Sequence, residues 1–110
     1  MNISKADAIA HLAKWYAAKT EIRAVYTTIT GNLSVVGRIK ELSASGITIT
    51  GTGCEMRLFF RETSEYDYRD ARQPDTEASK DRLNKYPTFI VVKFSNRDEV
   101  EVSEFFPEQN

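Results

Sequence analysis

The sequence has few of the residues that build disulfide frameworks, metal sites and membrane spans. Its 110 residues include one cysteine, Cys54, and one histidine, His11. A single thiol excludes an internal disulfide and favours a reducing compartment. No window approaches the roughly 18 apolar residues of a membrane-spanning helix, and no charged and apolar leader opens the chain. We therefore predict a cytoplasmic protein without a membrane partner.

Motifs for catalysis and for cofactor binding are also missing. No Cys-x-x-Cys, His-x-x-x-His or phosphate-binding glycine loop occurs, and a catalytic triad needs a nucleophile, a base and an orienting acid together. Cys54 falls among the apolar members of an alternating segment, so we expect a buried thiol and no nucleophile. We interpret Asp67 and Asp70 as parts of a solvated loop, because cation sites usually gather more oxygens. The prediction is a non-catalytic protein without metal or cofactor.

Enough apolar residues are present for one folded domain spanning residues 1–110. Hydrophobic residues make up 41% and aromatic residues 11% of the chain, which argues against global disorder. The formal charge of −1 is unevenly distributed: residues 1–61 carry eight basic and four acidic side chains, net +4, and the rest carry −5. Two interpretations follow, a mixed soluble surface or a basic face in the first half that meets an anion.

Residues 5–19 predict an N-terminal helix. Ser4 is a suitable N-cap, and Asp7 lies where a carboxylate favours the positive helix end. An apolar stripe with helical spacing consists of Ile9, Leu12, Ala13 and Tyr16. Trp15 lies beside this stripe, and we expect the stripe to be the buried face.

From residue 21 to residue 61 the apolar period changes to two, which predicts short antiparallel strands. Turns are expected at Gly31-Asn32, at 43–46 and at 51–53, and Gly37 is expected to mark a bend or bulge. The order of the elements favours a mainly β fold. We predict a small, strongly bent antiparallel β-barrel with the helix across one face.

The second half of the chain divides into a polar part and an apolar part. Residues 62–87 are charge-dense and predict an insertion, with a short helix over 75–85 as one alternative to a mobile segment. Residues 88–106 predict a final hairpin. Its first strand, 88–94, is nearly continuously apolar and should be covered on both faces.

Five side chains form the candidate binding surface. Alternation places Arg38 and Lys40 on one face of one strand, and it places Arg57, Phe59 and Arg61 on one face of another. If these faces adjoin, cations surround an exposed ring, which suits single-stranded nucleic acid. The alternative is that Phe59 packs under the helix and the cations only keep the protein soluble.

The stretch IRAVYTTITGNLSVVGRIKELSASGITIT resembles the first motif of the Sm/Hfq-like family of SH3-like barrels. Gly31 and Gly37 would fill the two glycine places of that motif, and the resemblance extends over residues 5–61 and more loosely over 88–105. Ser43 and Ile47 stand where the family carries an acidic and an RNA-contacting residue. The resemblance implies a small barrel that binds RNA or assembles with copies of itself through strand edges.

A second set of residues resembles PilZ, a barrel family that binds cyclic di-GMP. The segment from Glu41 to Gly46 keeps the serine, Ser43, and the glycine of one PilZ motif, and Lys19-x-x-x-Arg23 keeps one arginine of the other. The resemblance implies that Lys19, Arg23, Ser43 and Gly46 contact a nucleotide. Our leading hypothesis is a non-catalytic binding module for single-stranded nucleic acid or for a second copy, and the alternative is a cyclic di-GMP-responsive regulatory domain.

Overall fold

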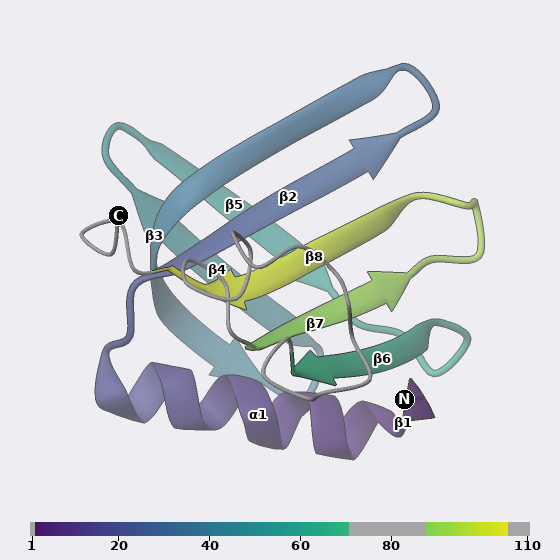
Figure 1. The fold of residues 1–110 in the computed structure, drawn as a ribbon, viewed down its shortest axis with the longest axis horizontal. Coiled ribbons are helices and arrows are strands. Elements are labelled where there is room, and N and C mark those ends of the chain that lie inside the picture. Colours follow the sequence, from purple (N-terminus) through teal and green to yellow (C-terminus); the bar gives the residue numbers. More distant parts are fainter. Residues whose placement is uncertain (1, 71–87, 106–110) are drawn as a thin grey trace.

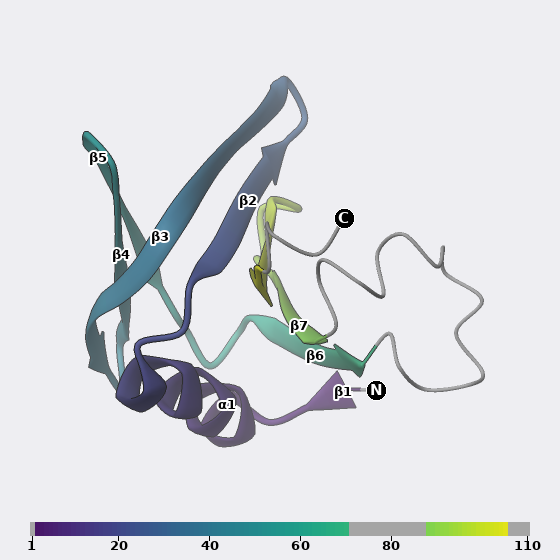
Figure 2. The same ribbon diagram turned by 60° about the vertical axis from the view of Figure 1, so that its left-hand side comes forward.

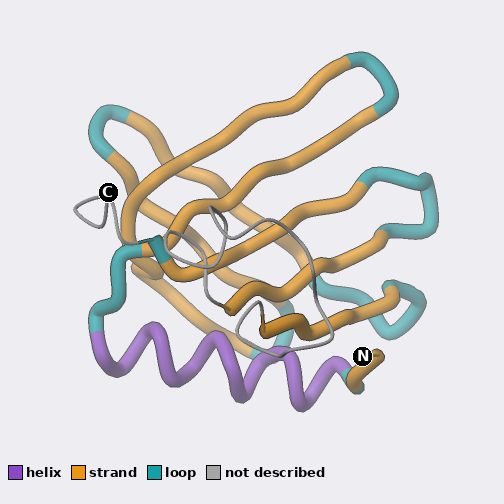
Figure 3. The backbone as a smooth tube through the Cα atoms, viewed as in Figure 1, coloured by secondary structure: helices purple, strands orange, loops and turns teal. Residues whose placement is uncertain are grey.

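A computed structural model describes residues 2–70 and 88–105, which form one helix and eight strands. The helix is α1 (Lys5–Ala18), and the strands are β1 (Asn2–Ile3), β2 (Ile22–Thr28), β3 (Gly31–Ser43), β4 (Gly46–Gly51), β5 (Cys54–Phe59), β6 (Glu65–Asp70), β7 (Thr88–Lys93) and β8 (Glu99–Glu104). All strands belong to one antiparallel sheet with the order β1-β6-β7-β8-β2-β3-β4-β5 (Figures 1 and 3).

The sheet is strongly curled, and α1 lies along the side where the curl opens. Figure 2 shows one wall that contains β4 and β5, another that contains β6 and β7, and the helix beneath both. The two terminal strands, β1 and β5, do not pair with each other. The predicted mainly β fold with an N-terminal helix is confirmed, and the sheet is open where a closed barrel was expected.

The long strand β3 belongs to both walls. It pairs with β2 up to Gly37 and with β4 from Gly37 onward. A side-chain carbon at Gly37 would lie 1.9 Å from the carbonyl oxygen of Thr50, so only glycine permits this approach of the two backbones. The bulge itself lies three residues later, because the register with β4 shifts between Ile39 and Glu41.

The helix begins as predicted, and its buried face overlaps only in part with the predicted stripe. The Ser4 hydroxyl accepts a hydrogen bond from the Asp7 backbone N–H at 3.1 Å. The fully or largely buried helix residues are Ala8, Leu12 and Trp15. Tyr16, expected in the buried stripe, is 44% exposed. The prediction was wrong for Tyr16 and correct for Leu12, and Ile9 is partly buried against the core. No helix in the described part of the chain is long and apolar enough to cross a membrane.

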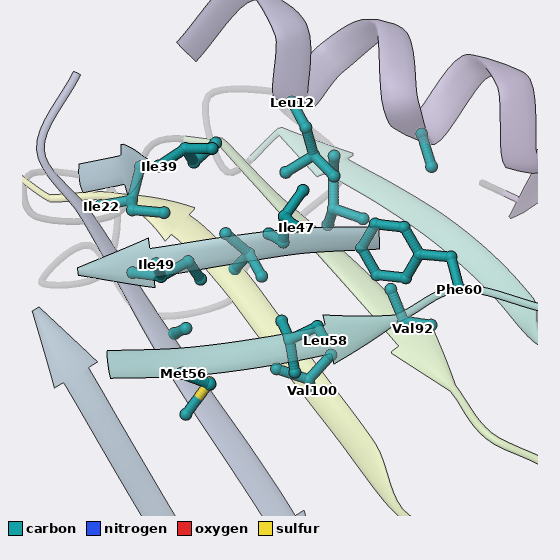
Figure 4. Close-up of a cluster of buried hydrophobic side chains, with 14 of the residues drawn as sticks. Leu12, Ile22, Ile39, Ile47, Ile49, Met56, Leu58, Phe60, Val92 and Val100 are labelled. Atoms are coloured by element: carbon teal, nitrogen blue, oxygen red, sulfur yellow. The ribbon is translucent and has the colours of Figure 1, made fainter. Parts of the chain in front are cut away.

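The core fills the space between the two walls and the helix. Figure 4 shows Leu58 and Phe60, at the end of one wall, close to Val100 and Val92 of the other, with Leu12 approaching from the helix. These side chains are almost fully buried. Burial of this kind is the main stabilising contribution in a small domain.

The prediction for residues 62–87 was wrong in its first part. Residues 65–70 form β6, which pairs with β7 over its whole length. Its apolar positions are Tyr66 and Tyr68, and Tyr66 is buried while its hydroxyl donates to the Arg61 carbonyl oxygen at 2.9 Å. The possible helix at 75–85 lies outside the described residues.

The remaining turns and the last hairpin follow the sequence closely, with one shift. The β2–β3 turn consists of Ile29 and Thr30, because Thr28 pairs with Gly31. The observed turn therefore lies two residues before the expected one at Gly31-Asn32. The final hairpin is confirmed in β7 and β8, and most residues of β7 are buried as predicted.

Candidate functional site

The outer face of β3, β4 and β5 brings part of the predicted surface together. Two rows of side chains cross it: Arg38, Thr50 and Glu55 in one, and Glu41, Thr48 and Arg57 in the other. The two arginines therefore lie diagonally opposite, and glutamates occupy the other two corners. Arg57 Nε lies 3.8 Å from Glu55 Oε1. This face is mixed in charge, because each cation has an acidic neighbour in the adjoining row.

The bulge in β3 separates the two cations that were expected to share a regular strand face. Glu41, and not Lys40, stands in register with Thr48. Arg38 and Lys40 nevertheless both line an open hollow of about 660 Å³ along β3, and Cys54 lines the same hollow. The thiol is exposed, contrary to prediction. Cys54 opens β5 directly after a turn and faces Gly51, which has no side chain to cover it.

Phe59 presents its ring to solvent. The ring is 66% exposed, because Leu58 and Phe60 on either side occupy the inward positions. The alternative in which Phe59 packs under α1 is therefore wrong. The neighbouring Arg57 side chain is also 73% exposed. The Phe59 ring and the Arg57 guanidinium are therefore both accessible, and Glu55 is the acidic neighbour of Arg57.

A second open hollow, of about 350 Å³, lies between β5 and the β7–β8 turn, and we call it the aromatic–arginine hollow. Its lining residues are Tyr26, Arg57, Leu58, Phe59, Arg61, Ser64, Phe94, Ser95 and Asn96. It gathers three aromatic rings and two guanidinium groups, and no carboxylate is among the described residues that line it. Two carboxylates lie beside lining residues: Glu55 is close to Arg57, and Asp98 accepts hydrogen bonds from Tyr26 and Asn96.

Tyr26 and Phe94 are the members of this hollow that the sequence did not suggest. Their rings stack with centroids 5.8 Å apart, and the Tyr26 hydroxyl donates to Asp98 Oδ2 at 2.9 Å. Burial raises the pKa of Tyr26, and the hydrogen bond to Asp98 and its charge raise it further. The phenol therefore stays protonated at neutral pH and keeps the carboxylate bound. Tyr26 shares the inward face of β2 with Ile22 and Ala24, so alternation within that strand does not single it out as a surface residue.

The structure thus divides the five predicted residues into two groups. Arg57, Phe59 and Arg61 share the aromatic–arginine hollow, and Arg38 and Lys40 line the hollow along β3.

The second set of predicted residues is also divided. Ser43 and Gly46 face each other in the β3–β4 hairpin. Arg23 is paired with Val36, seven positions before Ser43 on β3, and Lys19 caps the end of α1. Ser43 and Gly46 therefore lie at the C-terminal end of β3, whereas Arg23 lies beside the middle of β3. The PilZ-like set does not form one cluster.

Potential metal ligands are scattered in the described part of the chain, where no three His, Cys, Asp or Glu side chains converge. Asp67 belongs to strand β6 and not to a solvated loop; it is buried and pairs with Arg69 at 3.0 Å. Burial acts to raise the pKa of Asp67. Hydrogen bonds and positive charges beside the carboxylate, those of Arg69 among them, outweigh this effect and hold the pKa below its usual value.

His11 packs on the sheet with its ring stacked on Tyr68 at 4.0 Å. Burial lowers the pKa of His11 below 6.5, Lys14 lowers it further, and Asp7 opposes the shift. The folded state therefore favours the neutral ring, and its contribution to stability is present above pH 6.5 and is lost as the pH falls towards the folded-state pKa. We expect an NMR titration of this single histidine to give a pKa below 6.5. A value at or above 6.5 would contradict the stacked, partly buried position.

Comparisons with known proteins leave the site to be interpreted from its geometry. The chain matches no family model, and no curated protein or solved structure is significantly similar to it. The Sm/Hfq-like and PilZ-like resemblances both stay hypotheses.

Proposed function

We propose that this chain is a non-catalytic binding module, built on a small barrel-like sheet, that holds single-stranded nucleic acid at the aromatic–arginine hollow. The observation that carries the proposal is the exposed Phe59 ring, which shares this hollow with Arg57 and Arg61 and with no carboxylate among the described lining residues. Stacking platforms flanked by cations are the usual means of binding single strands without strict sequence preference.

Each side chain has a distinct role in this proposal. The Phe59 ring stacks on a base, and Arg57 and Arg61 contact the phosphates on either side of it. The Tyr26 hydroxyl donates its proton to Asp98, so Tyr26 contributes its ring and no hydrogen-bond donor. Glu55, close to Arg57, opposes the phosphate charge. We therefore expect modest affinity with a clear dependence on salt.

Replacement of Phe59 by alanine is expected to weaken oligonucleotide binding by about tenfold or more, since stacking on one base contributes roughly 1–3 kcal/mol. The measurement is fluorescence anisotropy with a labelled single-stranded oligonucleotide at low and moderate salt. Tyr16→Ala is the matched control, because Tyr16 is a partly exposed ring on α1, and it should bind like the wild type.

The arginines are tested in the same titration. Arg57→Gln combined with Arg61→Gln should reduce the salt dependence, by roughly 0.7 in the slope for each phosphate contact removed, whereas Lys14→Gln on the helix should leave it unchanged. Failure of the wild type to bind in a salt-sensitive manner would contradict the proposal. Binding of cyclic di-GMP that is weakened by Arg23→Ala and not by Phe59→Ala would favour the PilZ-like alternative.

A further inference from the structure

The first half of β3 has a strand on one side only. Residues 31–36 pair with β2, while the pairing with β4 begins at Gly37. Among the described residues, no strand lies along the other side of this segment. Figure 2 shows the outer part of the β2–β3 hairpin diverging from β4 and β5. The segment is therefore a free sheet edge in the middle of the strand order.

This edge lacks the features that usually protect such edges. No charged residue occurs from 24 to 37, although 28% of the chain is charged, and no proline interrupts the hairpin. Ile29 at the tip is fully exposed, and Leu33 is 62% exposed. By contrast β5, at the end of the sheet, carries Glu55 and Arg57. Soluble proteins normally place charges, prolines or bulges on free edges, because a bare edge accepts another strand.

Space for an added strand lies beside this edge. The hollow of about 660 Å³ is lined on one side by Ser34 and Val36 of the edge. On the other side it is lined by Thr52 of the β4–β5 turn and by Cys54, the first residue of β5. This space exists because the pairing of β3 with β4 ends at Gly37 and Gly51, and the two chains diverge beyond that pair. An added strand that pairs with residues 31–36 would therefore lie in open space between β3 and the β4–β5 turn.

We infer that residues 32–36 pair antiparallel with the same residues of a second copy, which joins the two sheets across a two-fold axis. The segment is self-complementary, since it has free backbone groups and no charge that would repel its own image. With the axis at Ser34, Leu33 stands opposite Val35 of the other copy on the same face of the joined sheet. This pairing covers the exposed Leu33 side chain. The inference is independent of the aromatic–arginine hollow, which uses other strands.

Ser34→Lys tests the inference directly. Ser34 is exposed, and the axis would place the two introduced ammonium groups next to each other. We expect sedimentation velocity to show a dimer for the wild type and a dissociation constant raised about tenfold or more for Ser34→Lys. Thr27→Lys is the matched control: Thr27 is exposed on the same hairpin, and its strand is paired on both sides, with Asn32 and Glu99. Thr27→Lys should dimerise like the wild type.

Amide hydrogen exchange gives a second readout that does not depend on a variant. Exchange within residues 32–36 should slow as the wild-type concentration rises, and this effect should be absent in Ser34→Lys. A wild type that stays monomeric into the high micromolar range overturns the inference, whatever else the edge binds. A dimer whose dissociation constant is unchanged in Ser34→Lys also overturns the inference. The same holds if Ser34→Lys and Thr27→Lys abolish the dimer equally.

Discussion

Gly37→Ala is expected to destabilise the fold by about 3 kcal/mol or more. The added carbon would lie 1.9 Å from the Thr50 carbonyl oxygen and 2.8 Å from the Gly51 Cα, and both belong to the backbone of β4. Neither atom can turn aside as the end of a flexible side chain can. The methyl group is therefore accommodated only if β3 and β4 separate where β3 passes from one wall to the other. Urea unfolding followed by circular dichroism measures the effect.

The same chemical change at Gly53 provides the control. Gly53 lies in the β4–β5 turn with φ of +74°, and a side-chain carbon there would meet no atom within 4 Å. Gly53→Ala should therefore cost only the strain of a left-handed backbone, about 1 kcal/mol. Equal losses for the two variants would mean that β3 and β4 do not approach each other this closely at Gly37.

Leu12→Ala should also cost about 3 kcal/mol, because it leaves a cavity between the helix and the sheet. Leu12 is 1% exposed at the centre of the buried helix face, with Ala8 and Trp15 on either side. The expected result is a large fall in the free energy of unfolding, measured by the same denaturant titration.

Tyr16→Ala distinguishes the observed helix face from the one that periodicity suggested. Tyr16 is 44% exposed, so its truncation should change stability by less than about 1 kcal/mol. If Tyr16→Ala were as costly as Leu12→Ala, the helix would be rotated towards the stripe that contains Tyr16.

Local signals predicted the elements well where one interaction dominated. The N-cap at Ser4 depends on a hydrogen bond three residues away, and the turn at Ser43 to Gly46 depends on residues within four positions. Such features need no knowledge of the rest of the fold. Alternation likewise placed Leu58 inside and Arg57 outside.

The errors have a common physical origin in contacts between distant residues. Strand β6 has charged residues at four of its six positions, and its identity as a strand comes from pairing with β7. Cys54 follows the inward alternation of β5, yet it is exposed at the rim, where Gly51 opposite cannot cover it. The bulge at Lys40 removes this side chain from the regular strand face that it was predicted to share with Arg38. A pattern within one strand contains neither the position of the rim nor the register with the next strand.

The same limit explains how much of the site was predictable. Phe59 and Arg57 belong to β5 and Arg61 follows it by two residues, so the sequence alone could place these three side chains together. Tyr26 belongs to β2 and Phe94 directly follows β7, and the curl of the sheet brings both to the same hollow. Each looks like a core residue within its own segment, and only the tertiary arrangement makes them part of a surface.

The position of β2 in the sheet also affects how the protein is made. One side of β2 pairs with β3, which follows it directly in the chain, and the other side pairs with β8. The two residues that join β2 to β8 through the Ser103 hydroxyl and the Arg23 carbonyl oxygen are 80 positions apart in the sequence. During synthesis β2 therefore leaves the ribosome long before its second partner exists. The nascent chain must keep an almost uncharged strand out of contact with its neighbours until the C-terminal hairpin emerges. Slow translation prolongs this interval and crowded polysomes add partners, so these are the conditions most prone to misassembly.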